Sequence, residues 1–139
     1  PANKENQVYL QKISSEILQN NGESYIMRMF PQDEGTSERI IATFNQARDD
    51  EYGELLEQCE DLLRELGKES ILGKFTFAEL EENEDELQKL ARWYQKIIDR
   101  DFFGASLHPC ADEKLEECRA RLELFSKEVF QRSDEVPHG

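Results

Sequence analysis

The residues best suited to chemistry form one polar group, Asn45, Arg48, Glu51 and Tyr52, at spacings of one, three and four residues. In a helix such spacings place all four side chains on one face. The guanidinium of Arg48 is a planar fork of donors that suits an oxyanion, and Asn45 and Tyr52 add neutral donors. The alternative is a surface interaction of Arg48 with Glu51 or Tyr52, contributing roughly a few tenths of a kcal/mol. We keep both interpretations at this stage.

A second candidate lies where Arg100 and Asp101 precede the aromatic pair Phe102-Phe103. Charges beside two rings at a helix end suit a binding site, and they equally suit an ending that anchors the helix by burying its aromatic residues. We therefore treat Arg100 and Asp101 as a secondary ligand-binding candidate.

Other chemistry finds little support. The chain has no glycine-rich phosphate loop and no Gly-x-Ser-x-Gly motif. Cys59 and Cys118 fall on apolar stripes and are expected to be buried thiols, while His108-x-Cys110 alone is a weak metal signal. No Glu-x-x-His occurs, and the acidic run over residues 79–86 is expected to face mostly water. We expect no catalytic residues, metal or cofactor; a metal-dependent enzyme using that run is the weakest alternative.

Three long helices are expected to position these residues. The first spans roughly 37–67, the second starts at the capping box Thr76-x-x-Glu79 and ends before Gly104, and the last is capped by Asp112 and runs to Gln131. Apolar residues spaced by three and four mark the face of each helix that packs against the others. Those predicted to face inward are Tyr52, Leu55, Cys59, Leu62, Leu66, then Leu80, Leu87, Leu90, Tyr94, Ile97, then Leu115, Cys118, Leu122, Phe125 and Val129.

The first 35 residues have a different pattern. A one-sided helix is predicted over 4–20 and one β-strand over 24–30, ended by Pro31. A single strand leaves its backbone groups unpaired, so we expect completion by a second copy or by further strands upstream. The fold class is thus mainly α: long antiparallel helices, like a three-helix bundle, preceded by a short helix and one strand. The predicted domains are a helix-strand remnant (1–35), a helical domain (36–133) and a flexible tail (134–139).

The net charge of −14 limits the partners. Residues 49–101 contribute −10 of it, against −1 before and −3 after, which matches the solvated faces of helices or a surface for a basic partner. Nucleic acid binding needs clustered Lys and Arg, so direct contact by this chain alone is not expected. No stretch is long and apolar enough for a membrane span, no signal-peptide pattern starts the chain, and three cysteines do not suit a disulfide framework. We expect a cytoplasmic protein with reduced thiols.

Three blocks resemble a known family. Phe44-Asn45-Gln46-Ala47-Arg48-Asp49-Asp50-Glu51-Tyr52, Phe75-Thr76-Phe77-Ala78-Glu79-Leu80-Glu81-Glu82-Asn83-Glu84 and Arg100-Asp101-Phe102-Phe103-Gly104-Ala105 occur in the order found in the N-terminal region of the chromate-resistance regulator ChrB. The resemblance covers residues 44–105, with looser flanks. It implies a bacterial protein tied to chromate resistance, in a family whose members regulate transcription of a chromate efflux transporter.

This resemblance shapes the functional expectation. The chain is expected to be a truncated, stand-alone ChrB-like protein that starts partway into the N-terminal region and lacks the separate C-terminal domain. Its expected role is a non-enzymatic sensing or regulatory helical module, acting as a homodimer, with chromate as the candidate oxyanion at Arg48. The alternative is a helical dimerisation or protein-interaction scaffold that binds no small ligand.

Overall fold

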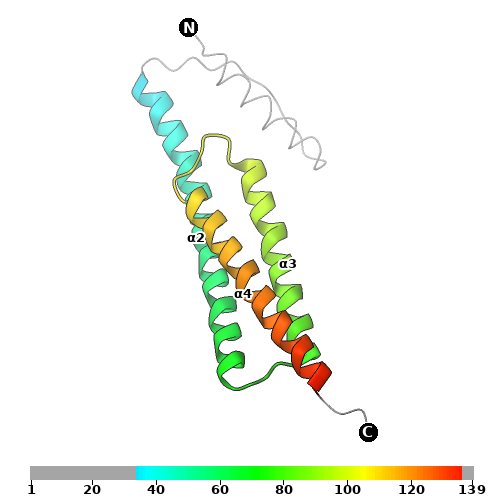
Figure 1. The fold of residues 1–139 in the computed structure, drawn as a ribbon. Helices are drawn as coiled ribbons and strands as arrows, with labels where there is room; N and C mark the ends of the chain where they lie inside the picture. The colour runs from blue at the N-terminus through cyan, green and yellow to red at the C-terminus, as the bar shows by residue number, and fades with distance from the viewer. Residues whose placement is uncertain (1–33, 136–139) are drawn as a thin grey trace.

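The computed structural model describes residues 34–135, and these form three long helices. They are α2 (Glu34–Ile71), α3 (Phe77–Arg100) and α4 (His108–Glu135). The chain runs up and down through them, and every pair of helices packs together, as Figure 1 shows. The predicted mainly α, bundle-like architecture is confirmed for this part. The helix predicted over 4–20 and the strand predicted over 24–30 lie outside the described residues.

One apolar stripe from each helix forms the core. The positions predicted to face inward are buried, apart from Leu87, which is partly buried and packs against the core. Because charged residues make up 35% of the chain, each helix has room for one narrow stripe only. Three such stripes facing a common axis bury one another and leave the charged faces in water. Residues that reach 0% exposure include Tyr52, Leu55, Cys59, Leu90, Ile97, Ala111 and Cys118.

Asn83 fills a position in the α3 stripe that the sequence analysis missed because the residue is polar. It is 4% exposed, and its Nδ2 donates a hydrogen bond of 2.7 Å to Oε2 of Glu69 on α2, itself 3% exposed. A buried polar group is tolerated when it is paired. Burial raises the pKa of Glu69 to about 7. The hydrogen bond from Asn83 lowers this pKa, whereas the neighbouring carboxylates of Glu79 and Glu65 raise it further.

The connection between α2 and α3 differs from the expectation at its first end only. α2 continues through Gly67 to Ile71, and Gly73, at φ 68°, makes the turn instead. Backbone N–H groups of Gly73 and Lys74 bond to the last carbonyls of the helix, at 3.2 and 2.8 Å. The predicted start of α3 is confirmed, because Thr76 is its N-cap and accepts from the Glu79 backbone N–H at 3.2 Å.

The predicted cap of the last helix is wrong. α4 begins at His108, four residues before Asp112, and the Ala111 N–H bonds to the Leu107 carbonyl at 3.0 Å. Pro109 suits this first turn, because a nitrogen without hydrogen needs no partner there. At its other end α4 runs to Glu135, beyond the predicted limit at Gln131 and the domain boundary at 133.

None of the three described helices carries an apolar stretch long enough to cross a bilayer.

We expect Glu69 to make stability fall as pH rises. Its folded pKa of about 7 lies above the value of 4.5 for a free glutamate, so the folded state holds the proton more tightly between those values. The free energy of unfolding should therefore lose up to about 3 kcal/mol from this group between pH 4.5 and 7.

Urea denaturation of the wild type and of Glu69→Gln at pH 5 and pH 8 checks this expectation. Glutamine keeps the acceptor for Asn83 and never ionises, so the variant should be the more stable protein at pH 8 and should lose less stability than the wild type between the two conditions. An equal change in both proteins would contradict the assignment.

Candidate functional site

The four polar residues predicted to share a helix face do so on α2, opposite the end of α3. Arg48 and Glu51 lie at the edge of the bundle, with 17% and 27% of their side chains exposed. Tyr52, one position further, points inward and is fully buried. The periodicity of α2 thus gives the patch an exposed side and a buried side, and Asn45 is partly buried.

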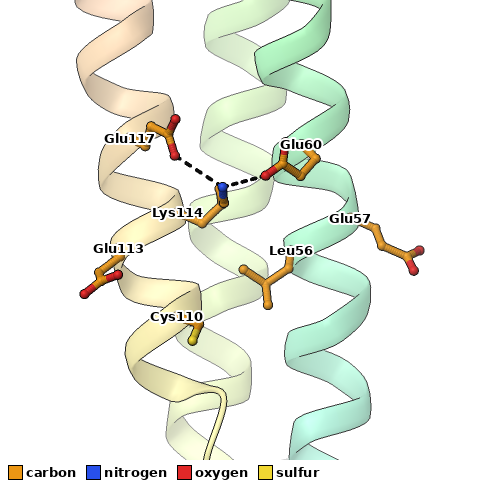
Figure 2. A pocket seen from close by; sticks show the side chains of 7 residues that line it. All are labelled: Leu56, Glu57, Glu60, Cys110, Glu113, Lys114 and Glu117. Carbon is orange, nitrogen blue, oxygen red and sulfur yellow. Dashed lines mark ion pairs between the residues drawn. The ribbon is translucent and has the colours of Figure 1, made fainter.

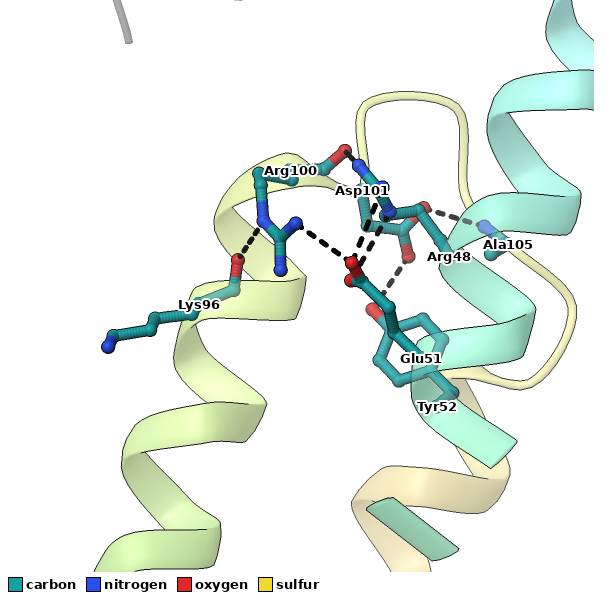
Figure 3. A network of polar contacts seen from close by, with 7 residues as sticks. All are labelled: Arg48, Glu51, Tyr52, Lys96, Arg100, Asp101 and Ala105. Carbon is teal, nitrogen blue, oxygen red and sulfur yellow. Dashed lines mark hydrogen bonds and ion pairs between the residues drawn. The ribbon is translucent and has the colours of Figure 1, made fainter. Parts of the chain in front are cut away.

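Two guanidinium groups meet one carboxylate in this patch, as Figure 3 shows. Nη1 of Arg100, at the end of α3, donates to Oε1 of Glu51 at 2.8 Å, while Arg48 Nη2 lies 3.5 Å from the same oxygen. Arg48 Nη1 also reaches the Arg100 carbonyl at 3.5 Å, and Arg100 Nε bonds to the Lys96 carbonyl at 3.1 Å. Glu51 therefore occupies a position between two cations, where a small anion would also be favoured.

Several polar atoms of this patch have no hydrogen-bond partner. Among the described residues, the buried atoms without one are Asn45 Oδ1, Arg48 Nε and Glu51 Oε2. The last two lie 3.4 Å apart as an ion pair, but outside hydrogen-bond geometry. Folded proteins rarely leave buried polar atoms unsatisfied, so each such atom calls for an explanation. The patch is thus the least satisfied polar region in the described part of the chain.

Asp101 joins α2 to the loop that follows α3. Its Oδ2 accepts from the Tyr52 hydroxyl at 2.8 Å, and its Oδ1 accepts from the Ala105 backbone N–H, also at 2.8 Å. Burial and then the bond to Asp101 raise the pKa of Tyr52 well above its usual value. The only hydroxyl proton of Tyr52 is already donated, so this residue holds Asp101 rather than offering a donor to a ligand.

A second aspartate, Asp49 on α2, holds the same loop further along. Asp49 accepts from the Ser106 hydroxyl at 2.8 Å and from the Leu107 backbone N–H at 2.9 Å. Just outside, the rings of Phe44 and Phe103 pack with their centroids 5.6 Å apart. Two carboxylates and one aromatic pair therefore fix the α3–α4 connection against α2. Asp49 is not among the residues predicted from the sequence, because an acid on a highly charged helix gives no local sign of such distant partners.

We call this contact between α2 and the α3–α4 connection the joint. Inside it, three polar side chains are linked by hydrogen bonds. The Tyr94 hydroxyl donates to Asp112 at 3.0 Å, so His108 Nε2, 3.1 Å from the same oxygen, must act as the donor to it. The imidazole also stacks on Tyr52, with ring centroids 5.7 Å apart. Burial, then Asp112, raises the pKa of Tyr94 to about 12. Asp112, predicted as a helix cap, instead accepts the hydrogen bond from Tyr94.

The two ligand-binding candidates predicted from the sequence thus lie together in one site. Arg48 and Glu51 contact Arg100, and Tyr52 contacts Asp101, although about 50 residues separate the partners. Two of the three sequence blocks, at 44–52 and 100–105, form this joint. The third block, at 75–84, lies in the α2–α3 connection and the first turns of α3, where it supplies the Thr76 cap and Asn83.

A separate groove lies between α2 and α4. It has a volume of about 500 Å³, and Lys114 crosses it to Glu60 at 2.5 Å and to Glu117 at 3.3 Å, as Figure 2 shows. Cys110, an exposed free thiol, lies on its wall.

The acidic run of α3 faces water at most positions, with Glu81, Glu82, Glu84 and Asp85 exposed. Across residues 34–135, no three or more His, Cys, Asp or Glu side chains are grouped so that they could hold a metal ion.

In its described part the structure is a helical bundle with a charged contact between α2 and the α3–α4 connection at one end. Comparison with known proteins places it further: the family model described as "Protein ChrB, N-terminal" matches residues 1–136. The chain belongs to this family, which is a regulatory one. No curated protein and no solved structure matches the chain.

We expect Asp49→Ala to loosen the joint. The substitution removes two hydrogen bonds to a charged acceptor, so the free energy of unfolding should fall by about 2 kcal/mol, and amide exchange at Leu107 should accelerate. Chemical denaturation and hydrogen-exchange mass spectrometry measure the two effects.

The neighbouring Asp50 provides the matched control. It is exposed and bonds only locally, to Gln46 at 2.9 Å, so Asp50→Ala should cost roughly half a kcal/mol or less. Equal losses from both substitutions would show that Asp49 does not hold the loop.

Proposed function

We propose that this chain is a non-enzymatic sensing module of a chromate-resistance system, linked to transcriptional control of a chromate efflux transporter. Family membership supports the regulatory part of this proposal. The specific part of the proposal is that an oxyanion is sensed. It rests on one observation: two guanidinium groups converge on the single carboxylate of Glu51, among buried polar atoms that lack hydrogen-bond partners. With a net charge of −14, the chain is not proposed to contact DNA by itself.

In this proposal Glu51 holds the place of the ligand. A tetrahedral dianion such as chromate offers more acceptor atoms and more charge than one carboxylate, so it competes for Arg48 and Arg100. Asn45 lies three residues from Arg48 and adds an amide to the same wall. Tyr52 is not proposed as a ligand donor, since its proton is donated to Asp101. Exchange of the anion for Glu51 would free that side chain and alter the contact between α2 and the end of α3.

Calorimetric titration of the purified chain with chromate and with sulfate tests the sensing role. We expect chromate to bind, Arg48→Gln to weaken binding about tenfold or more through the lost charged hydrogen bonds, and Glu51→Gln to tighten it by removing the competing carboxylate. Arg39→Gln is the matched control, because Arg39 is exposed on the same helix and, among the described residues, its side chain bonds only to Gly35 and Thr36 in the first turn.

Chromate binding that is unchanged in Arg48→Gln would move the site elsewhere. Equal heats with chromate and sulfate, or none with either, would reject a specific chromate sensor.

The second candidate function is a homodimerisation or protein-interaction scaffold in the same regulatory setting. An exposed apolar patch favours it: Ile71 is 87% exposed, Leu72 57% and Phe77 51%, all at the end of α2 and the start of α3. Phe130 on α4, 55% exposed, packs its ring edge-on against Phe77 with centroids 5.2 Å apart. Contiguous exposed apolar side chains are typical of interaction surfaces.

Light scattering after size-exclusion chromatography, over a range of concentrations, tests for the homodimer. If this patch forms the interface, Phe130→Glu should weaken self-association at least about tenfold, because it buries a charge in an apolar contact. Gln131→Glu adds the same charge at the neighbouring exposed position and should leave the mass unchanged. A monomeric mass at all concentrations would reject the homodimer.

A further inference from the structure

Two buried cysteines face each other across the α2–α4 packing. Cys59 on α2 and Cys118 on α4 are both 0% exposed, in a core otherwise made of apolar side chains. The Cys118 thiol donates to the backbone carbonyl of Cys59, with a distance of 3.5 Å between sulfur and oxygen. The sulfur of Cys118 thus lies against the backbone of Cys59, and the two side chains influence one another electrostatically.

The two thiols are chemically unequal. The neighbouring Cys118 side chain lowers the pKa of Cys59, and the positive charge of Lys114 acts in the same direction, whereas burial opposes them. The Cys59 side chain, followed by burial, raises the pKa of Cys118 far above its usual value. Cys59 is therefore the thiol that more readily becomes a thiolate, and Cys118 stays protonated beside it.

The groove in Figure 2 lies beside this pair, although both cysteines are fully buried and neither lines it. Its walls include Leu56 and Glu60, which flank Cys59 on α2, and Lys114 and Glu117, which precede Cys118 on α4. Its volume of about 500 Å³ is many times that of a peroxide molecule. Lys114 spans the groove through its two ion pairs and has an influence on both thiols.

We propose that Cys59 and Cys118 form a redox site, in which a peroxide converts the pair into a disulfide between α2 and α4. The Cys59 thiolate attacks one oxygen of hydrogen peroxide, the O–O bond breaks, and hydroxide leaves, so Cys59 becomes a sulfenic acid. The sulfur of Cys118 then attacks that of Cys59, and the S–O bond breaks as water leaves. In total two thiols and one peroxide give one disulfide and two waters, with the sulfurs losing two electrons and the peroxide gaining them.

The disulfide would bear on the joint described above. Cys59 lies about two turns beyond Tyr52 on α2, and Cys118 lies ten residues into α4. Joining them fixes the distance between α2 and α4 just below the loop that Asp49 holds. An oxidant would thus fix to α4 the helix α2, which carries Arg48 and Glu51 of the proposed anion site, through chemistry that needs no anion.

The test uses the full chain carrying Cys110→Ser, which removes the exposed thiol. After treatment with hydrogen peroxide and alkylation of the remaining thiols, peptide mass spectrometry should find the peptides of Cys59 and Cys118 joined, two hydrogens lighter than the reduced pair and separable by dithiothreitol. Adding Cys118→Ser should instead trap the sulfenic acid at Cys59, measured as its dimedone adduct. Adding Cys59→Ser should give less adduct at Cys118, because burial still disfavours the thiolate of that residue.

Far-ultraviolet circular dichroism checks that each variant is helical, and alanine replaces serine where a buried hydroxyl unfolds the chain. Recovery of both core cysteines as free thiols, under peroxide exposure that oxidises Cys110 of the unsubstituted chain, would overturn the proposal. Equal adducts on the two single-thiol variants would overturn the assignment of Cys59 as the attacking sulfur.

Discussion

The scarcity of apolar surface decides how this bundle is built. With 35% charged residues, each helix has a single narrow stripe to bury, and a stripe on one helix is dry only while the other two helices face it. No pair of these helices would bury its stripes alone. The polar features described above are consequences of this arrangement, because they sit where the stripes end or are interrupted.

At one end the stripe of α2 passes from Tyr52 into the charged residues before it, and at the other end Asn83 and Glu69 interrupt the apolar contact of α2 with α3. Both places contain acids that are partly or wholly removed from water. At the joint, arginines, backbone N–H groups and a tyrosine compensate the acids, whereas Glu69 has mainly an amide and carries a raised pKa as a result. The two ends of the bundle are thus electrostatically different.

The sequence predicted the parts of this fold that are periodic. The three helices, the Thr76 cap and nearly all core positions follow from spacing and local capping rules, and residues such as Leu55 and Val129 lie where the pattern put them. The partners of Asp49 and Asp101 could not be predicted from the sequence, because they lie in a loop whose path is set by tertiary contacts. The start of α4 was misplaced for a related reason: Asp112 has the chemistry of a cap, but Tyr94 uses it.

The unequal lengths of the helices have a mechanical consequence. α2 has 38 residues against 24 in α3, and its first turns extend past the α3–α4 connection in Figure 1. From Tyr52 to the start of the helix at Glu34, a straight helix measures about 27 Å. This length acts as a lever arm with its pivot at the charged joint: a tilt of about 10° there would displace the far end by about 5 Å. Small rearrangements among Arg48, Glu51 and Arg100 are therefore amplified several-fold at the beginning of α2.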